Sequence, residues 1–403
     1  MKILHTADWH LGKSFNNVSL LSDQKYILEQ LLAIIIQEKP DLVLLAGDIY
    51  DRAAPPADAV VLFDDIVSKI VIDCQIPLLA IAGNHDSSER IDYLSSFSAK
   101  QGFHIVGKLK LPLEPIVFED NFGKVYFYAI PYTEPETLHR ILEHYQTTEQ
   151  GITLDKESIA KQREMLKNHS DIMKYLVNEI VSKHHTTDRI VFIGHLFVTG
   201  AKECKDSERQ LSIVGGAAEV SASIFSPLTY TALGHLHEEQ YFIDKKVAYA
   251  GSPLKYSFAE ADHDKGVLML TLDHEKVATI QTIPLKPQRD MLKVRGRIEN
   301  EVFSITDENL QPAETDFLEV MLDNKVPIIN AMKIIQQKYP NAQKLSYEYL
   351  KNQHQDGKLT VEKLGNISET ELFSLFYQKV TQQTMDSNHE EVIATAVRNL
   401  MCV

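Results

Sequence analysis

The sequence predicts a layered α/β domain, followed by a small α+β unit and a helical C-terminal segment. Short apolar runs alternate with amphipathic stretches up to about Ile283, where this alternation ends. Two amphipathic patterns lie at the end of the sequence. A length of 403 residues allows two or three domains. Contents of 44% hydrophobic and 24% charged residues are ordinary for globular proteins and argue against disorder.

The predicted strands of the first domain are short apolar runs that end at Gly, Asp, Asn or Pro, as buried strands do. They cover residues 2–6, 41–46, 77–82, 125–130, 189–193, 230–233 and 247–250. Residues 22–39 and 57–74 show helical periodicity between these strands. Residues 134–186 are mostly helical and carry no motif, so we interpret them as an insertion or a surface helical layer.

The first domain is expected to cover residues 1–283, and the α+β unit residues 284–350, with strands at its start, at 316–322 and at 344–350 and a helix at 328–339. Residues 351–367 begin with a polar run typical of a linker. The helical patterns at 369–382 and 388–401 fall within 368–403. Two short amphipathic helices need the body of the protein or a partner to cover their apolar faces.

A formal net charge of -15 argues against a protein that coats DNA or an anionic membrane through bulk charge. The stretch 284–300 is the exception, with five basic and two acidic residues. The three cysteines are far apart and form no CxxC motif, which indicates neither a disulfide framework nor a zinc site. With no signal peptide pattern and no long apolar run, we expect a cytoplasmic protein, associated with the nucleoid when it acts on DNA.

Five motifs of metal-ligand residues follow predicted strands. They are Asp8-x-His10, Gly47-Asp48, Gly83-Asn84-His85-Asp86, Gly194-His195 and Gly234-His235-x-His237. The carboxyl ends of adjacent strands converge at one edge of an α/β sheet, where ligands bind. Each motif alone has an ordinary explanation as a turn, and Asn-His-Asp could be a turn that caps a helix. Their joint occurrence at successive strand ends favours a shared site.

Carboxylate, amide and imidazole groups without thiolate favour Mn, Fe, Zn or Mg. Two such ions, ~3.5–4 Å apart, clamp the attacking and leaving oxygens of an in-line displacement and lower the pKa of bound water to ~7. We therefore expect a dinuclear site in which metal-bound hydroxide attacks a phosphodiester, without a covalent protein intermediate.

The ordered motifs resemble those of the calcineurin-like metallophosphoesterases. The resemblance implies a four-layer αββα sandwich and places Asp8, His10 and His237 on one metal. It places Asn84, His195 and His235 on the other, with Asp48 as the bridge. His85 matches the catalytic histidine of the family, and Asp86 is expected to orient it.

Within that superfamily, nearly all of residues 1–270 resemble the bacterial SbcD family of Mre-type nucleases. The supporting stretches include IVGGAAEVSASIF, YTALGHLHEEQ and YAGSPLKYSFAEADHDKGV. This resemblance implies a Mn-dependent exonuclease and endonuclease that acts on DNA ends and hairpins. Residues 284–350 are placed like a DNA-capping domain. The segment 368–403 is placed like the part that docks on the SMC-like coiled-coil ATPase SbcC, through Leu372, Phe373, Phe376 and Tyr377.

Basic residues beside the motifs are candidate DNA contacts, namely Lys13, Arg52, Arg90, Lys255, Arg289, Lys293, Arg295 and Arg297. Family members pair through helices near the active site. We therefore expect a homodimer, with residues 57–74 and 88–100 as candidate helices and Val60, Val61, Phe63, Leu94 and Phe97 as possible contacts. Where archaeal and eukaryotic relatives carry a histidine after the bridging aspartate, this chain has Asp51 and then Arg52.

Two other functions fit the metal motifs. The first is another phosphoesterase of the superfamily, such as a protein phosphatase or a cyclic-nucleotide phosphodiesterase. The second is a non-catalytic scaffold that keeps the phosphoesterase fold. The cap-like unit and the partner-like helices favour the nuclease over the first, and the complete ligand set favours it over the second.

Overall fold

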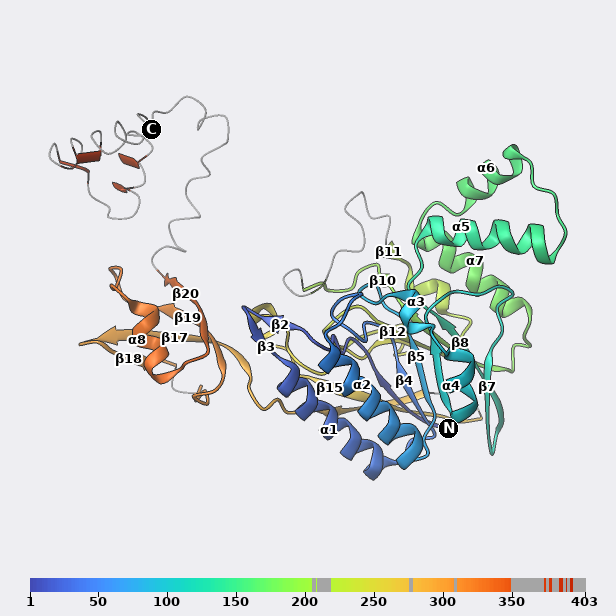
Figure 1. Ribbon diagram of the computed structural model, residues 1–403, viewed down its shortest axis with the longest axis horizontal. Helices are drawn as coiled ribbons and strands as arrows, with labels where there is room; N and C mark the ends of the chain where they lie inside the picture. The colour runs from blue at the N-terminus through green and yellow to red at the C-terminus, as the bar shows by residue number, and fades with distance from the viewer. Residues whose placement is uncertain are drawn as a thin grey trace. The chain divides into compact units, whose positions relative to one another are not determined.

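The computed structural model describes residues 1–204, 208, 219–274, 278–307 and 310–348, and a few short pieces between 373 and 393. The chain forms two compact units, Met1–Met291 and Leu292–Val403. Figure 1 colours them from blue to red along the chain. Each unit is described by itself below.

Two six-stranded sheets form the centre of the first unit. The order of strands in the first sheet is β16 (Ala278–Pro284), β15 (Gly266–Leu272), β1 (Lys2–Thr6), β4 (Leu42–Leu45), β5 (Leu78–Ile81) and β6 (Phe103–Val106). The four strands from β1 to β6 run parallel, and β15 and β16 join as an antiparallel extension. β4 and β5 are wholly buried, which accounts for their continuous apolar sequences.

The second sheet repeats this plan. Its order is β13 (Gln240–Phe242), β14 (Val247–Tyr249), β12 (Tyr230–Gly234), β9 (Arg189–His195), β8 (Gly123–Ile130) and β7 (Ile116–Asp120). The inner four strands are parallel, and each edge strand is antiparallel to its neighbour. The five motifs lie at the ends of five of these parallel strands, namely β1, β4, β5, β9 and β12.

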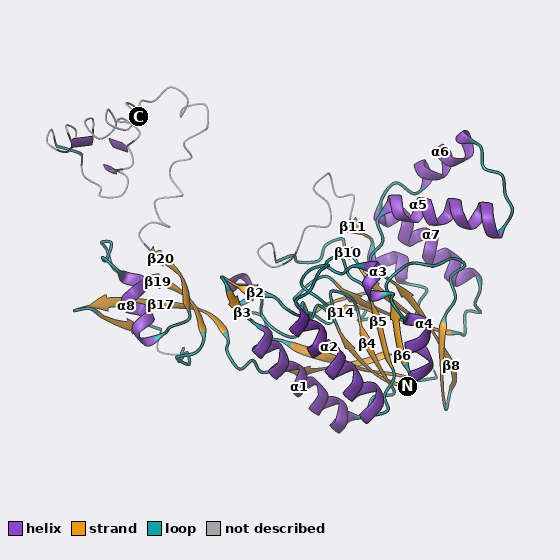
Figure 2. Ribbon diagram, viewed as in Figure 1, coloured by secondary structure: helices purple, strands orange, loops and turns teal. Residues whose placement is uncertain are grey.

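The two sheets pack face to face around one hydrophobic core. Ile3, Leu44 and Ile81 of the first sheet share a buried cluster with Phe127 and Ile193 of the second. Figure 2 shows the strands gathered in the middle of the first unit, with helices outside them.

The outer helical layers complete a four-layer arrangement. α1 (Leu21–Glu38) and α2 (Ala57–Ser68) lie side by side over the first sheet (Figure 1), and α1 buries Ile27, Leu31 and Ile35 at helical spacing. α5 (Pro135–His144) and α7 (His169–Ser182) bury apolar side chains in a common cluster with the second sheet. Residues 134–186 therefore form, in part, a helical layer that packs on the second sheet. α6 (Lys156–Met165) adds an exposed helix to this layer.

The expected helix at 88–100 is broken in the structure. α3 (Ser88–Ile91) and α4 (Ser95–Ser98) are single turns, separated by Leu94 in the left-handed region with φ 57°. α2 ends at Ser68, and a π-helical turn, Lys69–Asp73, follows it. The remaining short strands are β2 (Ser14–Phe15), β3 (Val18–Ser19), β10 (Phe197–Val198) and β11 (Glu219–Val220).

The second unit contains a four-stranded sheet and one helix. Strand order is β18 (Val302–Ile305), β17 (Met291–Glu299), β19 (Phe317–Leu322) and β20 (Ala342–Tyr347), and α8 (Ala331–Lys338) packs on this sheet. The sequence analysis missed β18, which is joined to β17 through Asn300 and Glu301, both at positive φ. In β17 buried residues alternate with exposed Lys293, Arg295 and Arg297.

Residues 351–367 and most of 368–403 lie outside the described residues, including Leu372 and Phe376 of the predicted partner-binding set. Phe373 is 40% exposed, and the ring of Tyr377 lies 5.6 Å from that of His389. None of the helices in the described parts of the chain combines the length and hydrophobicity needed to cross a lipid bilayer.

Candidate metal centre

The loops that follow β1, β4, β5, β9 and β12 meet at one edge of the two sheets. Asp8 and His10 follow β1, Asp48 follows β4, and Asn84 follows β5. His195 ends β9, and His235 and His237 follow β12. The first sheet therefore supplies mainly oxygen ligands, and the second supplies imidazoles. The metal centre needs ligands from both sheets.

The first group of ligand atoms belongs to Asp8, His10 and His237, and all of these atoms lie within 4.8 Å of one another. The Nε2 atoms of His10 and His237 are 3.1 Å apart. Both side chains are 1% exposed, and one of the two nitrogens can donate a hydrogen bond to the other in place of a metal. A cation between the two rings would satisfy both nitrogens.

The second group comprises Asp8, Asp48 and His195. Asp48 Oδ2 lies 3.4 Å from His195 Nε2 and 3.6 Å from His10 Nε2, so one carboxylate oxygen reaches both groups. This is the position expected of a bridging ligand. Asn84 Oδ1 is 2.9 Å from His195 Nε2, which brings the amide to the same point.

His235 lies beside this second group. Its ring centroid is 5.4 Å from that of His195, and its backbone N–H donates to Asp8 Oδ1 and Oδ2 at 3.0 and 3.1 Å. The bond to Asp8 ties the loop after β12 to the loop after β1. All seven predicted metal ligands are therefore brought together at this edge of the sheets.

The backbone is bent sharply at several of these ligands. Asp8, His10, Asp48 and His235 have φ values of 54°, 45°, 49° and 105°. For residues other than glycine such conformations cost ~1–3 kcal/mol each and cluster at functional sites. These backbone conformations turn each side chain out of its strand toward the shared point, and the surrounding fold stabilises them.

Two glycines are required by close packing inside the site. A Cβ on Gly83 would lie 2.1 Å from Asp48 Oδ1, and a Cβ on Gly234 would lie 1.9 Å from the carbonyl oxygen of Ala46. The loops after β4, β5 and β12 therefore touch backbone to backbone. Glycine in these motifs permits this close approach because it has no Cβ.

The electrostatics of the ligand set favour a cation. Burial raises the pKa of Asp8 to about 7. Burial opposes protonation of His195, but the carboxylate of Asp48 beside it outweighs that effect and raises the pKa of His195 to about 9. Burial would likewise raise the pKa of Asp48, but His195 and other nearby imidazoles hold it well below its usual value. Without a metal, protons on Asp8 and His195 therefore take part of the place that a cation would occupy.

The residues present fit two divalent cations. Their donors are oxygen and imidazole nitrogen, with no thiolate in the two ligand groups. Two ligand groups share Asp8, with Asp48 between them.

His85 stands at the rim of the centre. Its Nδ1 donates to the carbonyl oxygen of Asp51 at 2.7 Å, because a carbonyl can only accept. Its Nε2 is therefore the nitrogen left for a substrate. The backbone N–H of His85 also donates to Asp48 Oδ1 at 2.9 Å, which fixes the ring beside the ligands.

The predicted role of Asp86 as the group that orients His85 is wrong. The Asp86 carboxylate accepts hydrogen bonds from the backbone N–H groups of Ile49, Tyr50 and Gly83 at 2.9 to 3.1 Å. It therefore joins the loop after β4 to the loop after β5, while the carbonyl of Asp51 orients His85.

Several supporting residues escaped the sequence analysis. His237 Nδ1 lies 3.1 Å from Glu260 Oε1, and Lys265 Nζ lies 2.6 Å from Glu260 Oε2. Glu208 accepts from the backbone N–H of His237 at 2.7 Å. Gln24 of α1 donates to the carbonyl of His10 at 2.7 Å. The long sequence separations explain why no local pattern revealed these partners.

Some of the predicted DNA contacts form ion pairs within the protein, and others are exposed. Lys255 is 11% exposed and bonds to the carbonyl of Ala261 and to Asp290, so its prediction as a DNA contact is wrong. Lys13 lies 2.7 Å from Asp51. Arg52 and Arg90 are exposed near the centre.

In the second unit Arg295 and Arg297 are about half exposed, and they pair with Glu348 and Glu299 respectively. Arg289, in the first unit, forms an ion pair with Asp23 of α1.

The family comparison agrees with this centre. The family described as calcineurin-like phosphoesterase matches residues 1–239, more than half of the chain. The chain belongs to this family. A second family, described as the type 5 capsule protein repressor C-terminal domain (SbcD_C), matches residues 287–381. The two matches together support an SbcD-type nuclease and a hydrolase with a dinuclear metal site.

Three solved structures are similar to this chain at low identity. A dimetal phosphatase from Danio rerio is 12% identical, with a TM-score of 0.40, and the match covers 71% of this chain and 98% of that one. The protein TT1561 of Thermus thermophilus is 11% identical, with a TM-score of 0.36 and coverages of 70% and 98%. GAP50, the anchor in the inner membrane complex of Plasmodium, is 11% identical, with a TM-score of 0.31 and coverages of 72% and 90%.

Proposed function

We propose that this chain is the nuclease subunit of an SbcCD-type complex, a Mn²⁺-dependent exonuclease and hairpin endonuclease that processes DNA ends. The observation that carries the proposal is the pairing of a complete dinuclear ligand set with a C-terminal SbcD-type domain. A phosphatase or phosphodiesterase that acts on small substrates has no evident need of such a domain.

When bound, two divalent cations would supply a hydroxide nucleophile and stabilise the charge that develops on the phosphate. The chain's own residues prepare the site for them. Asp48 lies where it reaches both ligand groups, and Asn84 holds its amide oxygen beside His195. Glu260 fixes the ring of His237 so that its Nε2 faces His10.

His85 is suited to act on the leaving oxygen. With Nδ1–H donated to Asp51, protonation at Nε2 would allow His85 to donate a hydrogen bond or a proton to that oxygen. We expect His85→Ala to retain metal binding by calorimetry and to lose roughly 10²–10⁴-fold in the rate of phosphodiester cleavage. Loss of metal binding in this variant would contradict the role, since His85 is assigned no metal.

The proposed partners follow from the remaining parts of the chain. Residues 368–403 would dock on the SbcC-type ATPase, and exposed Lys293, Arg295 and Arg297 of β17 would contact DNA phosphates. Val60, Val61, Leu94 and Phe97 are 43–67% exposed, which suits a homodimer contact. Phe63 is 8% exposed and packs on Trp9 and Tyr50, so its prediction as a dimer contact is wrong.

The test is cleavage by the purified full-length chain with Mn²⁺, with and without its ATPase partner. We expect degradation of linear duplex DNA and opening of DNA hairpins, both abolished by a chelator and restored by added Mn²⁺. Asp48→Asn is the matched inactive control, because it removes the charge of the bridging ligand. Hydrolysis only of phosphoproteins or cyclic nucleotides would refute the nuclease and favour another phosphoesterase.

A further inference from the structure

Lys13 and Asp51 form an ion pair at the rim of the metal centre. Lys13 Nζ lies 2.7 Å from Asp51 Oδ1, and the two side chains are 17% and 24% exposed. The pair is therefore partly shielded from water, where opposite charges attract each other more strongly than at an open surface. Each partner lies in a loop that carries metal ligands, because Lys13 follows His10 after β1 and Asp51 follows Asp48 after β4.

Lys13 is held in place on the side of the first loop. Its backbone N–H donates to the carbonyl oxygen of His10 at 3.1 Å, and its own carbonyl accepts from the backbone N–H of Leu20 at 3.0 Å. The ammonium group lies over the ring of Tyr256, 5.5 Å from the ring centroid, and this ring packs 5.4 Å from the ring of His10. The position of the ammonium group is therefore fixed relative to a metal ligand.

Asp51 links this ammonium group to His85. The carbonyl oxygen of Asp51 accepts the hydrogen bond from His85 Nδ1 at 2.7 Å, while its carboxylate pairs with Lys13. The backbone N–H of Asp51 donates to the carbonyl of Leu11 at 3.2 Å, and residues 52–54 that follow are exposed. The ion pair is therefore a second attachment for a residue that stands next to an exposed turn. A shift of Asp51 would move the ring of His85.

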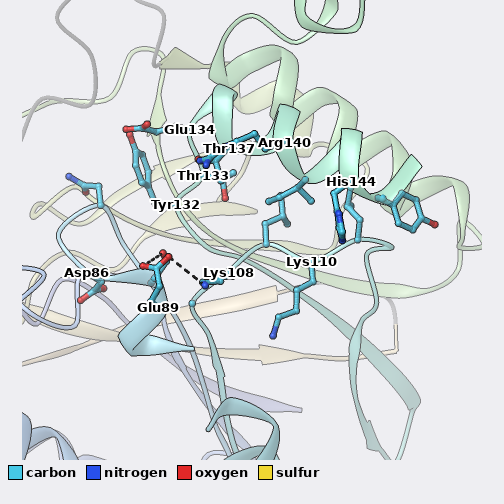
Figure 3. Close-up of a pocket in the computed structure, with 18 of the residues that line it drawn as sticks. Asp86, Glu89, Lys108, Lys110, Tyr132, Thr133, Glu134, Thr137, Arg140 and His144 are labelled. Carbon is cyan, nitrogen blue, oxygen red and sulfur yellow. Dashed lines mark hydrogen bonds and ion pairs between the residues drawn. The ribbon is translucent and has the colours of Figure 1, made fainter. Parts of the chain in front are cut away.

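The pocket that opens beside the loop after β5 is separate from this ion pair. Its volume is about 730 Å³, and Figure 3 shows that its Lys108 is joined to Glu89. The described residues that line it do not include Lys13, Asp51 or His85. The ion pair therefore belongs to the metal centre and not to the pocket.

We propose that Lys13 is a positioning residue for catalysis, which holds Asp51 so that its carbonyl keeps Nε2 of His85 directed at the leaving oxygen. The proposal rests on the role proposed above for His85 and adds a residue to it. It also implies that the charge of Lys13 is used within the protein, and that Lys13 is not the DNA contact that the sequence predicts.

The test compares cleavage of the para-nitrophenyl and phenyl esters of thymidine monophosphate by the full-length chain at saturating Mn²⁺. The leaving oxygen keeps the electron pair of the broken P–O bond, and nitrophenolate stabilises this charge without the help that phenolate needs. Lys13→Met should lower kcat about tenfold for the phenyl ester, which is part of the ~10²–10⁴-fold that general acid–base catalysis contributes. It should change kcat less than about twofold for the nitrophenyl ester and leave KM unchanged. Lys13→Arg keeps the charge and should retain most of the rate.

Double variants test whether Lys13 acts through His85. In a His85→Ala background, Lys13→Met should lower neither rate further, and Lys13→Met with Asp51→Asn should lose no more than either single variant. The control is Lys69→Met with Asp65→Asn, which removes an ion pair of the same length at the end of α2 and should leave both rates near those of the parent.

Equal loss of rate with both esters would overturn the proposal, because Lys13 would then support metal binding or folding. A further loss in the His85→Ala background would also overturn it, since Lys13 would act elsewhere. So would unchanged ester rates, and a fall of ~0.9 in the slope of log duplex affinity against log salt would then identify Lys13 as a phosphate contact. A chain that shows the expected ester rates but cuts no DNA with Mn²⁺ would refute the nuclease alone.

Discussion

Individual ligands at this centre are held by buried partners that lie far away in the sequence. Glu260 is fully buried, and its carboxylate joins His237 to Lys265. A carboxylate that accepts from one ring nitrogen fixes the tautomer and leaves the other nitrogen free for a metal. Lys265 compensates the buried charge and also donates to the carbonyl of His237 at 2.7 Å.

We expect Glu260→Gln to weaken metal binding roughly 10–100-fold, as loss of such a partner does at other metal sites. Isothermal titration with Mn²⁺ measures the change, and Glu119→Gln on the exposed face of β7 is the control. Glu260→Gln also leaves Lys265 without its counter-charge. The double variant Glu260→Gln with Lys265→Met removes both charges, and full recovery of metal affinity there would assign the loss to the stranded lysine instead.

Metal binding should depend steeply on pH. Metal-free His195, with a pKa of about 9, is protonated at neutral pH and must lose that proton to bind a cation. Affinity should therefore rise about tenfold per pH unit from 7 to 9. It should fall more steeply below pH 7, where Asp8, with a pKa of about 7, also becomes protonated. Titrations in buffers of different ionisation enthalpy would count the released protons, and a pH-independent affinity would contradict the assignment.

At the scale of elements, two helical segments carry exposed apolar side chains. Val61 of α2 and Leu94 before α4 are 66% and 57% exposed. We expect Val61→Asp with Leu94→Asp to convert the proposed homodimer to a monomer in sedimentation velocity. Val117→Asp, at a residue that is 45% exposed on β7, should leave the dimer intact. An unchanged dimer in the double variant would show that the subunits pair elsewhere.

The strands that end at a metal-ligand motif were easier to predict than the other elements, and β6, β7, β13, β15 and β16 were not predicted. β4 and β5 are continuous apolar runs followed by a motif, so their sequences indicate both the strand and the residue where it ends. The break at Leu94 carries no such mark, because its left-handed backbone depends on tertiary packing. β18 was missed for a different reason, since its sequence VFSI is short and half exposed.

The metal ligands could be predicted because each follows a strand directly. The role of Asp86 could not, because its three hydrogen bonds go to backbone groups that no side-chain pattern encodes. The prediction of Lys255 as a DNA contact was wrong because its ion-pair partner Asp290 approaches it only in the folded chain.

At the scale of the whole molecule, the match at 287–381 and the centre in the first unit suggest separable tasks. We expect deletion of residues 368–403 to abolish capture of the coiled-coil ATPase in a pull-down while Mn²⁺-dependent cleavage of a short DNA substrate remains. The full-length Asp48→Asn chain is the control, which should bind the ATPase and not cut. Retention of the ATPase by the shortened chain would place the docking surface elsewhere.

The two sheets each contribute only part of the ligand set, with Asp8, His10 and Asp48 on one and His195 and His237 on the other. A bound cation would thus act as a cross-link between the halves of the sandwich. Because a ligand that binds only the native state adds its binding free energy to folding, the loaded protein gains resistance to unfolding. Conversely, a substitution in the shared core that shifts one sheet against the other would separate the ligands and reduce catalysis without touching the site.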